Sequence, residues 1–201
     1  PKNFEKAIDD KTRCFYAETL PNPALRVFPI KEVSDIGRKH NIPLIMDNTA
    51  APVICKPIEH GATLVIHSLT KFIGGHGTTI GGIIVDSGKF NWAKDKDRQP
   101  ALNKPDPSYH GMVWTDFAEA VKMPIAYIVR ARFVGLRDLG SCLPPQSAFQ
   151  IIQGLETVSL RMVKHCENAA KVAEFLSSHN KVEKVIYAGL DEDEAGRRAN
   201  K

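Results

Sequence analysis

The stretch that decides the fold is Val65-Ile66-His67-Ser68-Leu69-Thr70-Lys71-Phe72-Ile73-Gly74-Gly75-His76-Gly77. An apolar run from Thr63 to His67 predicts a buried strand, and hydroxyl residues, one lysine and a glycine-rich turn follow it. In an α/β sheet, a strand that ends in such a turn places functional groups at the carboxyl edge, where ligands bind. We therefore expect Ser68, Thr70 and Lys71 to lie at a ligand-binding edge of a sheet.

The lysine of this turn has apolar neighbours and no carboxylate beside it. Such an amine loses its proton more easily than a solvated one, and a neutral lysine forms Schiff bases with carbonyl compounds, pyridoxal phosphate among them. Taken alone, Lys71 is better explained as an ordinary lysine at a strand end. A second apolar run, Ile42–Thr49, favours a cofactor-binding role for Lys71, because it places Asp47 at the same edge. Pyridoxal enzymes need a lysine for the aldehyde and commonly an aspartate for the pyridine nitrogen.

The first half of the chain alternates between strand and helix patterns. We expect helices at 4–10, 30–40 and 55–59, and strands at 12–18, 42–49, 63–67 and 78–86. Alternation of this kind favours parallel strands joined by right-handed crossovers. The predicted class is therefore α/β, with a mostly parallel sheet flanked by helices.

The second half reads as loop and helix. We expect a long loop at 90–114, a helix at 124–140, one or two helices at 145–179 with a possible break at Gly154, a strand at 182–187 and a frayed end at 191–201. Tyr109 and His110 fall in the loop, where they are assigned to packing ahead of catalysis. The long helical region predicts a core stripe of Phe149, Ile152, Leu155, Leu160, Val163 and Cys166.

Several motifs together resemble the fold-type I pyridoxal-phosphate enzymes of cysteine and methionine metabolism, with the sulfhydrylase branch most similar. The matching segments run in order from about Thr12 to Leu190: Asp47-Asn48-Thr49, His67–Gly77, Asp106–Gly111, Arg137–Gly140, Gln153–Thr157, Arg161-Met162 and His165–Asn168. The resemblance implies a large domain like that of aspartate aminotransferase, at 1–145. It further implies connecting helices at 146–180 and the start of a small C-terminal α+β domain at 181–201.

The same resemblance implies a reaction and a set of site residues. The reaction is γ-replacement on O-acetylhomoserine with sulfide or a thiol, giving homocysteine and acetate for methionine biosynthesis. Lys71 would hold the cofactor and move protons, and the carboxylate of Asp47 would keep the pyridine nitrogen protonated. Ser68 and Thr70 would bind the phosphate, and Asn22, in a Pro-Asn-Pro turn, would lie near the ring and the substrate. The family usually assembles as homodimers or homotetramers, and this chain corresponds to its central part.

Other classes of function find less support in the composition and motifs. The formal charge is +4, and the lysines and arginines are not clustered, so the sequence gives no indication of nucleic-acid binding. No apolar run approaches the length of a membrane-spanning helix. No signal peptide is visible, and four widely spaced cysteines predict free thiols and a cytoplasmic protein. The histidines lack metal-site spacing, so no metal is expected. Gly74–Gly77 is not a P-loop, and Ser68-x-x-Lys71 lacks the S-D-N and K-T-G partners of penicillin-binding enzymes.

Two alternatives stay open beside the sulfhydrylase hypothesis. The first is a sibling chemistry on the same scaffold, that of cystathionine γ-synthase, cystathionine γ-lyase or methionine γ-lyase. Leu69 and the run Phe72–Gly77 favour the sulfhydrylases over these siblings. The second alternative is a catalytically incomplete chain that keeps only fold and assembly surfaces.

Overall fold

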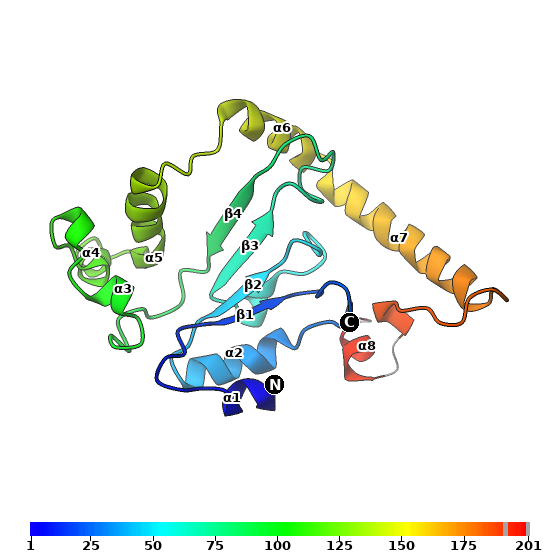
Figure 1. Cartoon of the computed structure of the whole chain (residues 1–201), viewed down its shortest axis with the longest axis horizontal. Helices are drawn as coiled ribbons and strands as arrows, with labels where there is room; N and C mark the ends of the chain where they lie inside the picture. The colour runs from blue at the N-terminus through cyan, green and yellow to red at the C-terminus, as the bar shows by residue number, and fades with distance from the viewer. Residues whose placement is uncertain (191–192, 200–201) are drawn as a thin grey trace.

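A computed structural model describes residues 1–190 and 193–199, which form one four-stranded sheet with helices around it (Figure 1). The strands lie in the order β1 (Phe15–Glu18), β2 (Leu44–Asp47), β3 (Leu64–Ser68) and β4 (Gly82–Asp86). All four agree with strands expected from the sequence, although β1, β2 and β4 are shorter than expected and β3 is shifted by one residue from 63–67. The order in space follows the order in the chain, so each strand pairs with the next one.

The sheet is mixed, with three parallel strands and one antiparallel strand. β1 pairs with β2 and β2 with β3 in parallel, whereas β4 pairs with β3 antiparallel. Helical or turn segments cross between the first three strands, so these strands run in the same direction. Between β3 and β4 the chain turns at the carboxyl edge, through the Lys71 turn, and no helix carries it back across the sheet. The expectation of a mostly parallel α/β sheet is confirmed.

Helices and single helical turns make up most of the remaining structure. They are α1 (Lys2–Lys6), α2 (Ile30–Lys39), η1 (Pro57–His60), α3 (Pro100–Asn103), η2 (Pro107–Tyr109), α4 (Trp114–Ala120), α5 (Ala126–Arg130), η3 (Ala131–Asp138), α6 (Pro145–Leu155), α7 (Val158–Ser177), η4 (Ala188–Leu190) and α8 (Glu194–Ala199). The helices expected at 30–40 and 124–140 are confirmed. The first helix begins and ends earlier than 4–10. No helix in the described ranges is long and apolar enough to span a membrane.

Helix α2 covers one face of the sheet because its apolar residues lie on one side. Ile30 and Val33 are buried, as expected from their helical spacing, and they pack in a core with Leu44 and Met46 of β2. Gly37 lets the helix approach the chain closely, since a Cβ there would collide with the carbonyl of Ile42. These contacts fix the position of β2, which carries Asp47 at its end.

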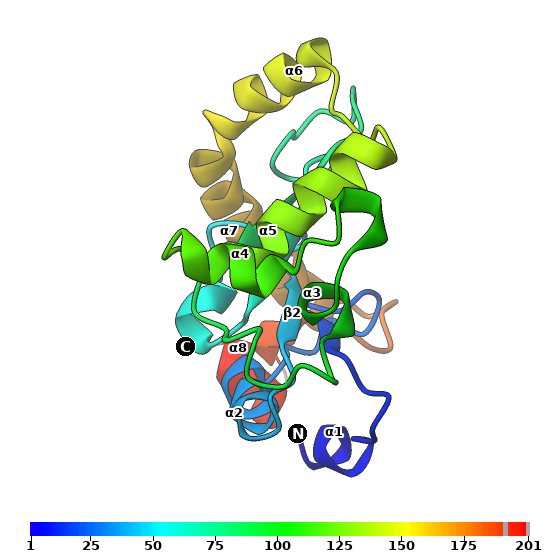
Figure 2. The same cartoon turned by 90° about the vertical axis from the view of Figure 1, so that its left-hand side faces the viewer.

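The segment expected as a long loop, 90–114, is structured and supports the other face of the sheet. It contains α3 and η2, and Trp92, Leu102 and Trp114 pack in a core with Leu64 of β3. The expectation was wrong because short helical turns with tryptophans at irregular spacing carry no periodic signal. Helices α3, α4 and α5 gather here, apart from α1 and α2 (Figures 1 and 2). Tyr109 stacks on Trp114, in agreement with a packing role.

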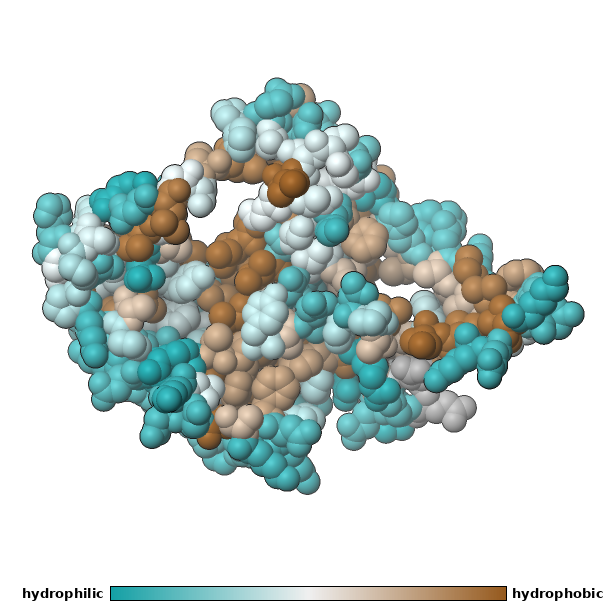
Figure 3. Space-filling model, viewed as in Figure 1, coloured by the Kyte–Doolittle hydropathy of each residue, from teal (hydrophilic) through white to brown (hydrophobic). Residues whose placement is uncertain are grey.

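The long helical region is two helices, but its predicted core stripe is wrong. The break lies at residues 156–157, and Gly154 is inside α6. Exposed fractions are 57% for Phe149, 56% for Ile152, 51% for Leu155, 73% for Leu160 and 56% for Val163, and Cys166 is also exposed. The face that packs on the Lys71 turn instead carries Ile151, Val158 and Met162. Figure 3 shows apolar residues exposed towards the outer end of α7.

The end of the described chain also departs from expectation. Residues 182–187 are not a strand, because no other strand lies beside them to pair with in the described residues. The segment 191–201, expected to fray, contains α8, and its residues 191–192 and 200–201 lie outside the described part. Arg26 pairs with Asp193, and the Arg198 guanidinium donates to the carbonyl of Val27 at 3.0 Å. These contacts tie α8 to the segment before α2.

Trp114 offers a test of the second core. It is fully buried, and its Nε1–H donates to Asp106 Oδ2 at 2.9 Å. We expect Trp114→Ala to lower the free energy of unfolding by about 3–5 kcal/mol, since it leaves a cavity, and Trp114→Phe to cost less. Urea unfolding of this chain measures both. The control Phe149→Ala, at an exposed position, should change stability by about 0.5 kcal/mol or less; equal losses at the two positions would contradict this packing.

Candidate active site at the carboxyl edge of the sheet

Three strands end together and define the candidate site. The register pairs Glu18 of β1 with Asp47 of β2, and Asp47 with Ile66 of β3. Residues at matched positions of parallel strands project to the same face, and residues two positions away share it. Asp47 therefore shares one face with Tyr16 and Ser68. This confirms that Asp47 and the Lys71 turn follow neighbouring strands at one edge.

Asp47 is partly buried, and both of its carboxylate oxygens have donors. The backbone N–H of Thr49 donates to Oδ1 at 2.9 Å, and the hydroxyl of Tyr16 donates to Oδ2 at 3.2 Å. Partial burial, with a smaller contribution from the negative charge of Asp47, raises the pKa of the Tyr16 hydroxyl. Neither Tyr16 nor Thr49 was given a role from the sequence. The signal for Tyr16 was its position two residues before Glu18, on the face that Asp47 uses.

Lys71 lies in a turn whose backbone is well fixed. Its N–H donates to the carbonyl of Ser68 at 3.4 Å, and its carbonyl accepts from the N–H of Gly75 at 2.8 Å. The side chain is exposed, so the expected crowding by apolar neighbours is wrong for this chain. The neighbours Leu69 and Ile73 are buried, but they face α6 and α7. No described side chain accepts a hydrogen bond from Nζ of Lys71.

The two hydroxyl residues of the turn have different environments. The backbone N–H of Ser68 donates to Thr49 Oγ1 at 2.8 Å, and no described group pairs with the Ser68 hydroxyl. The Thr70 hydroxyl is engaged, because it accepts from Gly81 N–H at 3.1 Å and faces the Gly81 carbonyl at 3.4 Å. Ser68 is thus free to bind a ligand, whereas Thr70 also joins the turn to the start of β4.

Asn22 follows β1 at the same edge of the sheet. Its backbone N–H donates to Glu18 Oε2 at 3.1 Å, which ties the Pro-Asn-Pro turn to the end of the strand. The Asn22 side chain is exposed and pairs with no described group. The five residues predicted from the sequence therefore all follow, or end, one of the three parallel strands.

A row of polar residues, two of them buried and one half-buried, lies on the opposite face of the same edge. Thr19, Asn48 and His67 each follow a register-matched residue by one position, so they project away from the Asp47 face. The atoms Thr19 Oγ1, Asn48 Oδ1 and His67 Nδ1 are buried and have no hydrogen-bond partner in the described part of the chain. Burial lowers the pKa of His67, and the nearby charge of Asp47 opposes this effect. None of the three was singled out from the sequence for a role in the site.

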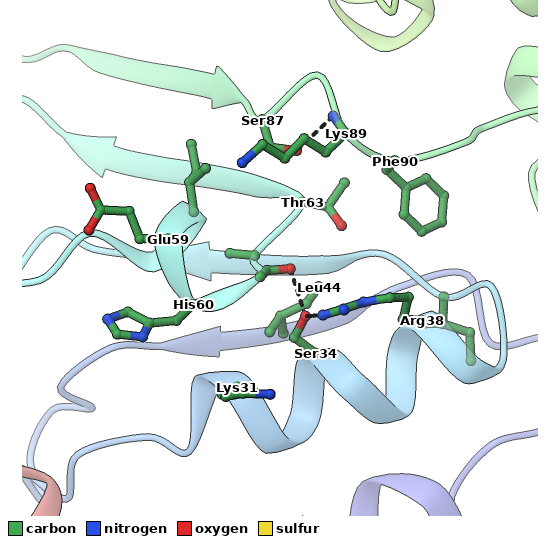
Figure 4. A pocket seen from close by; sticks show the side chains of 14 residues that line it. Lys31, Ser34, Arg38, Leu44, Glu59, His60, Thr63, Ser87, Lys89 and Phe90 are labelled. Atoms are coloured by element: carbon green, nitrogen blue, oxygen red, sulfur yellow. Dashed lines mark hydrogen bonds between the residues drawn. The ribbon is translucent and has the colours of Figure 1, made fainter.

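One pocket of the structure lies away from this edge. A cavity of about 500 Å³ is bordered by Lys31, Ser34 and Arg38 of α2 and by Thr63, Ser87 and Phe90 (Figure 4). Thr63 precedes β3 and Ser87 follows the antiparallel β4, so the cavity lies at the amino edge of the parallel strands. Its cations are partly neutralised within the chain, since Arg38 and Lys31 both pair with Asp35. It is separate from the edge that carries Asp47 and Lys71.

A doubly flanked α/β sheet with an acid and a lysine at its carboxyl edge is the arrangement of an enzyme domain that binds its cofactor there. The model of the Cys/Met metabolism PLP-dependent enzyme family matches residues 1–201. The chain therefore belongs to this family, as the sequence motifs predicted.

Relatives with assigned activities and solved structures agree with this family. The chain is 50% identical to the O-acetyl-L-homoserine sulfhydrylase of Leptospira meyeri, over all of this chain and 46% of the relative. It superposes with a TM-score of 0.88 on a Campylobacter jejuni protein assigned as an O-acetylhomoserine (thiol)-lyase, which carries N'-pyridoxyl-lysine-5'-monophosphate. That match has 37% identity and covers 99% of this chain and 49% of the other. Cystathionine γ-lyase of Lactobacillus plantarum gives 0.70 and 29% identity, covering 98% and 42%. The chain thus spans about half the length of these relatives.

The residues present fit the cofactor of the family. A carboxylate suits the protonated pyridine nitrogen, an amine suits the aldehyde, and a hydroxyl with neighbouring backbone N–H groups suits the phosphate. Asp47, Lys71 and Ser68 supply these groups in turn. The oxygen of Asp47 bonded to Tyr16 and the unpaired Nζ of Lys71 leave the edge polar and open to a ligand.

The half-buried imidazole of His67 predicts a pH dependence of stability. The pKa of His67 in the folded chain lies below its unfolded value of 6.5, so the unfolded chain binds the proton more readily. Neutral His67 therefore adds to the free energy of unfolding above pH 6.5. This contribution is lost as the pH falls from 6.5 towards the folded pKa, at a rate of at most about 1.4 kcal/mol per pH unit. Thermal unfolding between pH 5 and 8 should show this slope, and His67→Gln should flatten it. The exposed His60→Gln serves as the control; an unchanged slope in His67→Gln would contradict the assignment.

Proposed function

We propose that the complete gene product is a cytoplasmic sulfhydrylase of methionine biosynthesis that uses pyridoxal phosphate. It replaces the acetate of O-acetyl-L-homoserine by sulfide or a thiol and forms L-homocysteine when sulfide is the donor. The observation that carries this proposal is the Lys71 turn beside Asp47 at one sheet edge, in a chain half identical to a sulfhydrylase. The higher TM-score and identity to the (thiol)-lyase than to cystathionine γ-lyase support it over the sibling reactions.

In this proposal each residue of the edge has one task. Pyridoxal phosphate, when bound, supplies an electron-withdrawing ring that stabilises negative charge on the substrate carbons. The amine of Lys71 would hold the cofactor's aldehyde and, once free, would carry protons between the substrate carbons as base and acid. The exposed, unpaired state of Nζ leaves it free to move between these positions. Ser68 and Thr70 bind the phosphate, and Asn22 lies beside the ring and the substrate.

Asp47 keeps a proton on the pyridine nitrogen in this proposal. One of its oxygens is held by the N–H of Thr49, which fixes the carboxylate at the end of β2. Tyr16 donates to the other oxygen, Oδ2. The pyridine nitrogen would therefore either share Oδ2 with the Tyr16 hydroxyl or take the place of that hydroxyl. A fixed anion at this place favours the protonated ring without reorganisation during the reaction.

The wider organisation of the protein is part of the same proposal. Residues 1–145 belong to a cofactor-binding large domain, 146–180 connect, and 181–201 begin a smaller C-terminal domain. The protein assembles as a homodimer or homotetramer, and its partners are small-molecule substrates. A chain that keeps only the fold and assembly surfaces is the competing hypothesis. The open, exposed site edge of this chain is the observation that favours it.

Removal of the lysine tests the central assignment. We expect Lys71→Ala to abolish turnover and the visible absorption of bound pyridoxal phosphate together, because both need the same amine. Borohydride reduction followed by peptide mapping should place the adduct on Lys71 in the unchanged protein. Lys89→Ala, at the far edge of the sheet, is the matched control. An active Lys71→Ala variant would refute the assignment.

The same spectrum of the 201-residue chain decides between the enzyme and the incomplete chain. A visible band with the adduct on Lys71 means that this segment alone folds and holds the cofactor. A band in the complete gene product but not in the segment assigns the incomplete state to the segment. No band in either would reject the pyridoxal proposal.

Removal of the acid should separate cofactor binding from turnover. We expect Asp47→Ala to retain the visible band but to lower kcat by at least about 100-fold, because the ring nitrogen loses its fixed anion. Tyr16→Phe removes only the donor to Oδ2 and should have a much smaller effect. Steady-state kinetics with saturating pyridoxal phosphate measure both variants. Normal turnover by Asp47→Ala would remove Asp47 from its role.

A further inference from the structure

An arginine of α7 is bonded to the backbone that follows Lys71. The Arg161 Nη1 donates to the carbonyl of Phe72 at 2.7 Å, and Nη2 donates to the carbonyl of Ile73 at 3.2 Å. The same Nη2 donates to the Gly154 carbonyl at 2.8 Å, and Nε donates to Thr157 Oγ1 at 3.0 Å. One guanidinium therefore joins the turn of Lys71 to the junction between α6 and α7.

The helix and the turn approach closely because each has a glycine, which lacks a side chain, at the point of contact. A Cβ on Gly154 of α6 would collide with the carbonyl of Gly74, and a Cβ on Gly75 would overlap the guanidinium of Arg161. Gly75 also has a φ of +77°, which disfavours other residues. The helix and the turn thus meet backbone to backbone, and Arg161 supplies the donors for carbonyls that the turn leaves unpaired.

Apolar residues complete this contact around the charged group. Leu69 and Ile73, two residues before and two after Lys71, are buried against Ile151, Val158 and Met162 of α6 and α7. The side chain of Lys71 is exposed between them. The helices therefore hold the backbone on both sides of the lysine and leave its amine free.

We propose that Arg161 is a positioning residue for Lys71: it fixes the turn so that the amine reaches both the cofactor aldehyde and the substrate carbons. This inference rests on the proposed function. A lysine at position 161 would keep the charge but not the planar fork that serves several carbonyls at once. A loosened turn would spread the positions of the amine, and a displacement of about 1 Å costs a proton-transfer step about 100-fold.

The test compares Arg161→Lys and Arg161→Ala with Lys164→Ala in the complete gene product. Lys164 is exposed on the same helix, and among the described residues it pairs only with Glu167, so its removal should leave kinetics unchanged. We expect Arg161→Lys to lower kcat about 10- to 100-fold, with KM changed about threefold or less and the cofactor still bound. The pH at which the visible band changes should shift, and millimolar guanidinium should restore part of the kcat of Arg161→Ala.

Amide hydrogen exchange gives a readout that does not depend on activity. The N–H groups of Gly74 and Gly75, bonded to Leu69 and Lys71 carbonyls at 2.8 Å, should exchange faster in Arg161→Lys. If Arg161→Ala does not fold, Thr157→Val, which removes the acceptor of Nε and the long 3.4 Å hydrogen bond from the Thr157 hydroxyl to the Gly154 carbonyl, should give a smaller loss of the same kind.

The outcomes separate this proposal from the assignment of the reaction. Unchanged kcat, pH midpoint and exchange in Arg161→Lys would overturn the positioning role. So would a loss of thermal stability with normal turnover per molecule of bound cofactor, since that is a purely structural effect. If the unchanged protein shows no borohydride adduct on Lys71, the proposed function fails first and this inference with it.

Discussion

The register of the three parallel strands pairs Glu18 with Asp47 and Asp47 with Ile66. Strands that run in one direction end at one edge, so their terminal residues meet there however far apart they lie in the chain. The same register sends Tyr16, Asp47 and Ser68 to one face. A shift of one residue in β2 would move Asp47 into the apolar core under α2 and replace it at the site by Met46 or Asn48.

The two faces of that edge have separate tasks. On one face, α2 packs against Leu44 and Met46 and holds the strands together. On the other, α3, α4 and α5 cover Leu64 near the amino ends of the strands, and the carboxyl ends are left to polar groups. The cavity lined by Arg38 and Lys31 lies at the amino edge. The presence of a cavity alone would have placed the site there, whereas strand direction and residue chemistry place it at Asp47.

The sequence predicted the elements of this edge well, because their signals are local. The strands that lead to Asp47 and Lys71, and the helix at 30–40, depend on short apolar patterns that the structure confirms. Whether a side chain is exposed depends on contacts that no pattern records. Lys71 was expected among apolar neighbours and is exposed, because Leu69 and Ile73 face α6 and α7. Residues 182–187 have a strand composition but no strand beside them to pair with.

The helices α6 and α7 also show that a sequence pattern does not predict which side chains are buried, and they show the physical reason. Phe149, Ile152, Leu155, Leu160 and Val163 recur at helical spacing, and so do Ile151, Val158 and Met162. Hydrophobicity alone favours neither stripe, and the choice depends on which face can meet the backbone of the turn. Gly154 decides it, because only the face that carries a glycine can lie against the Gly74 carbonyl.

That contact explains how an exposed lysine can still be well placed. A long side chain is costly to hold in one position, and a catalytic amine that serves several atoms must be able to move. The structure restrains the backbone at Phe72 and Ile73 through Arg161 and leaves the side chain of Lys71 unrestrained. The backbone of the turn is therefore ordered, whereas the amine of Lys71 can move. Support of this kind comes from residues about 90 positions away in the chain, which is why it is visible only once the fold is known.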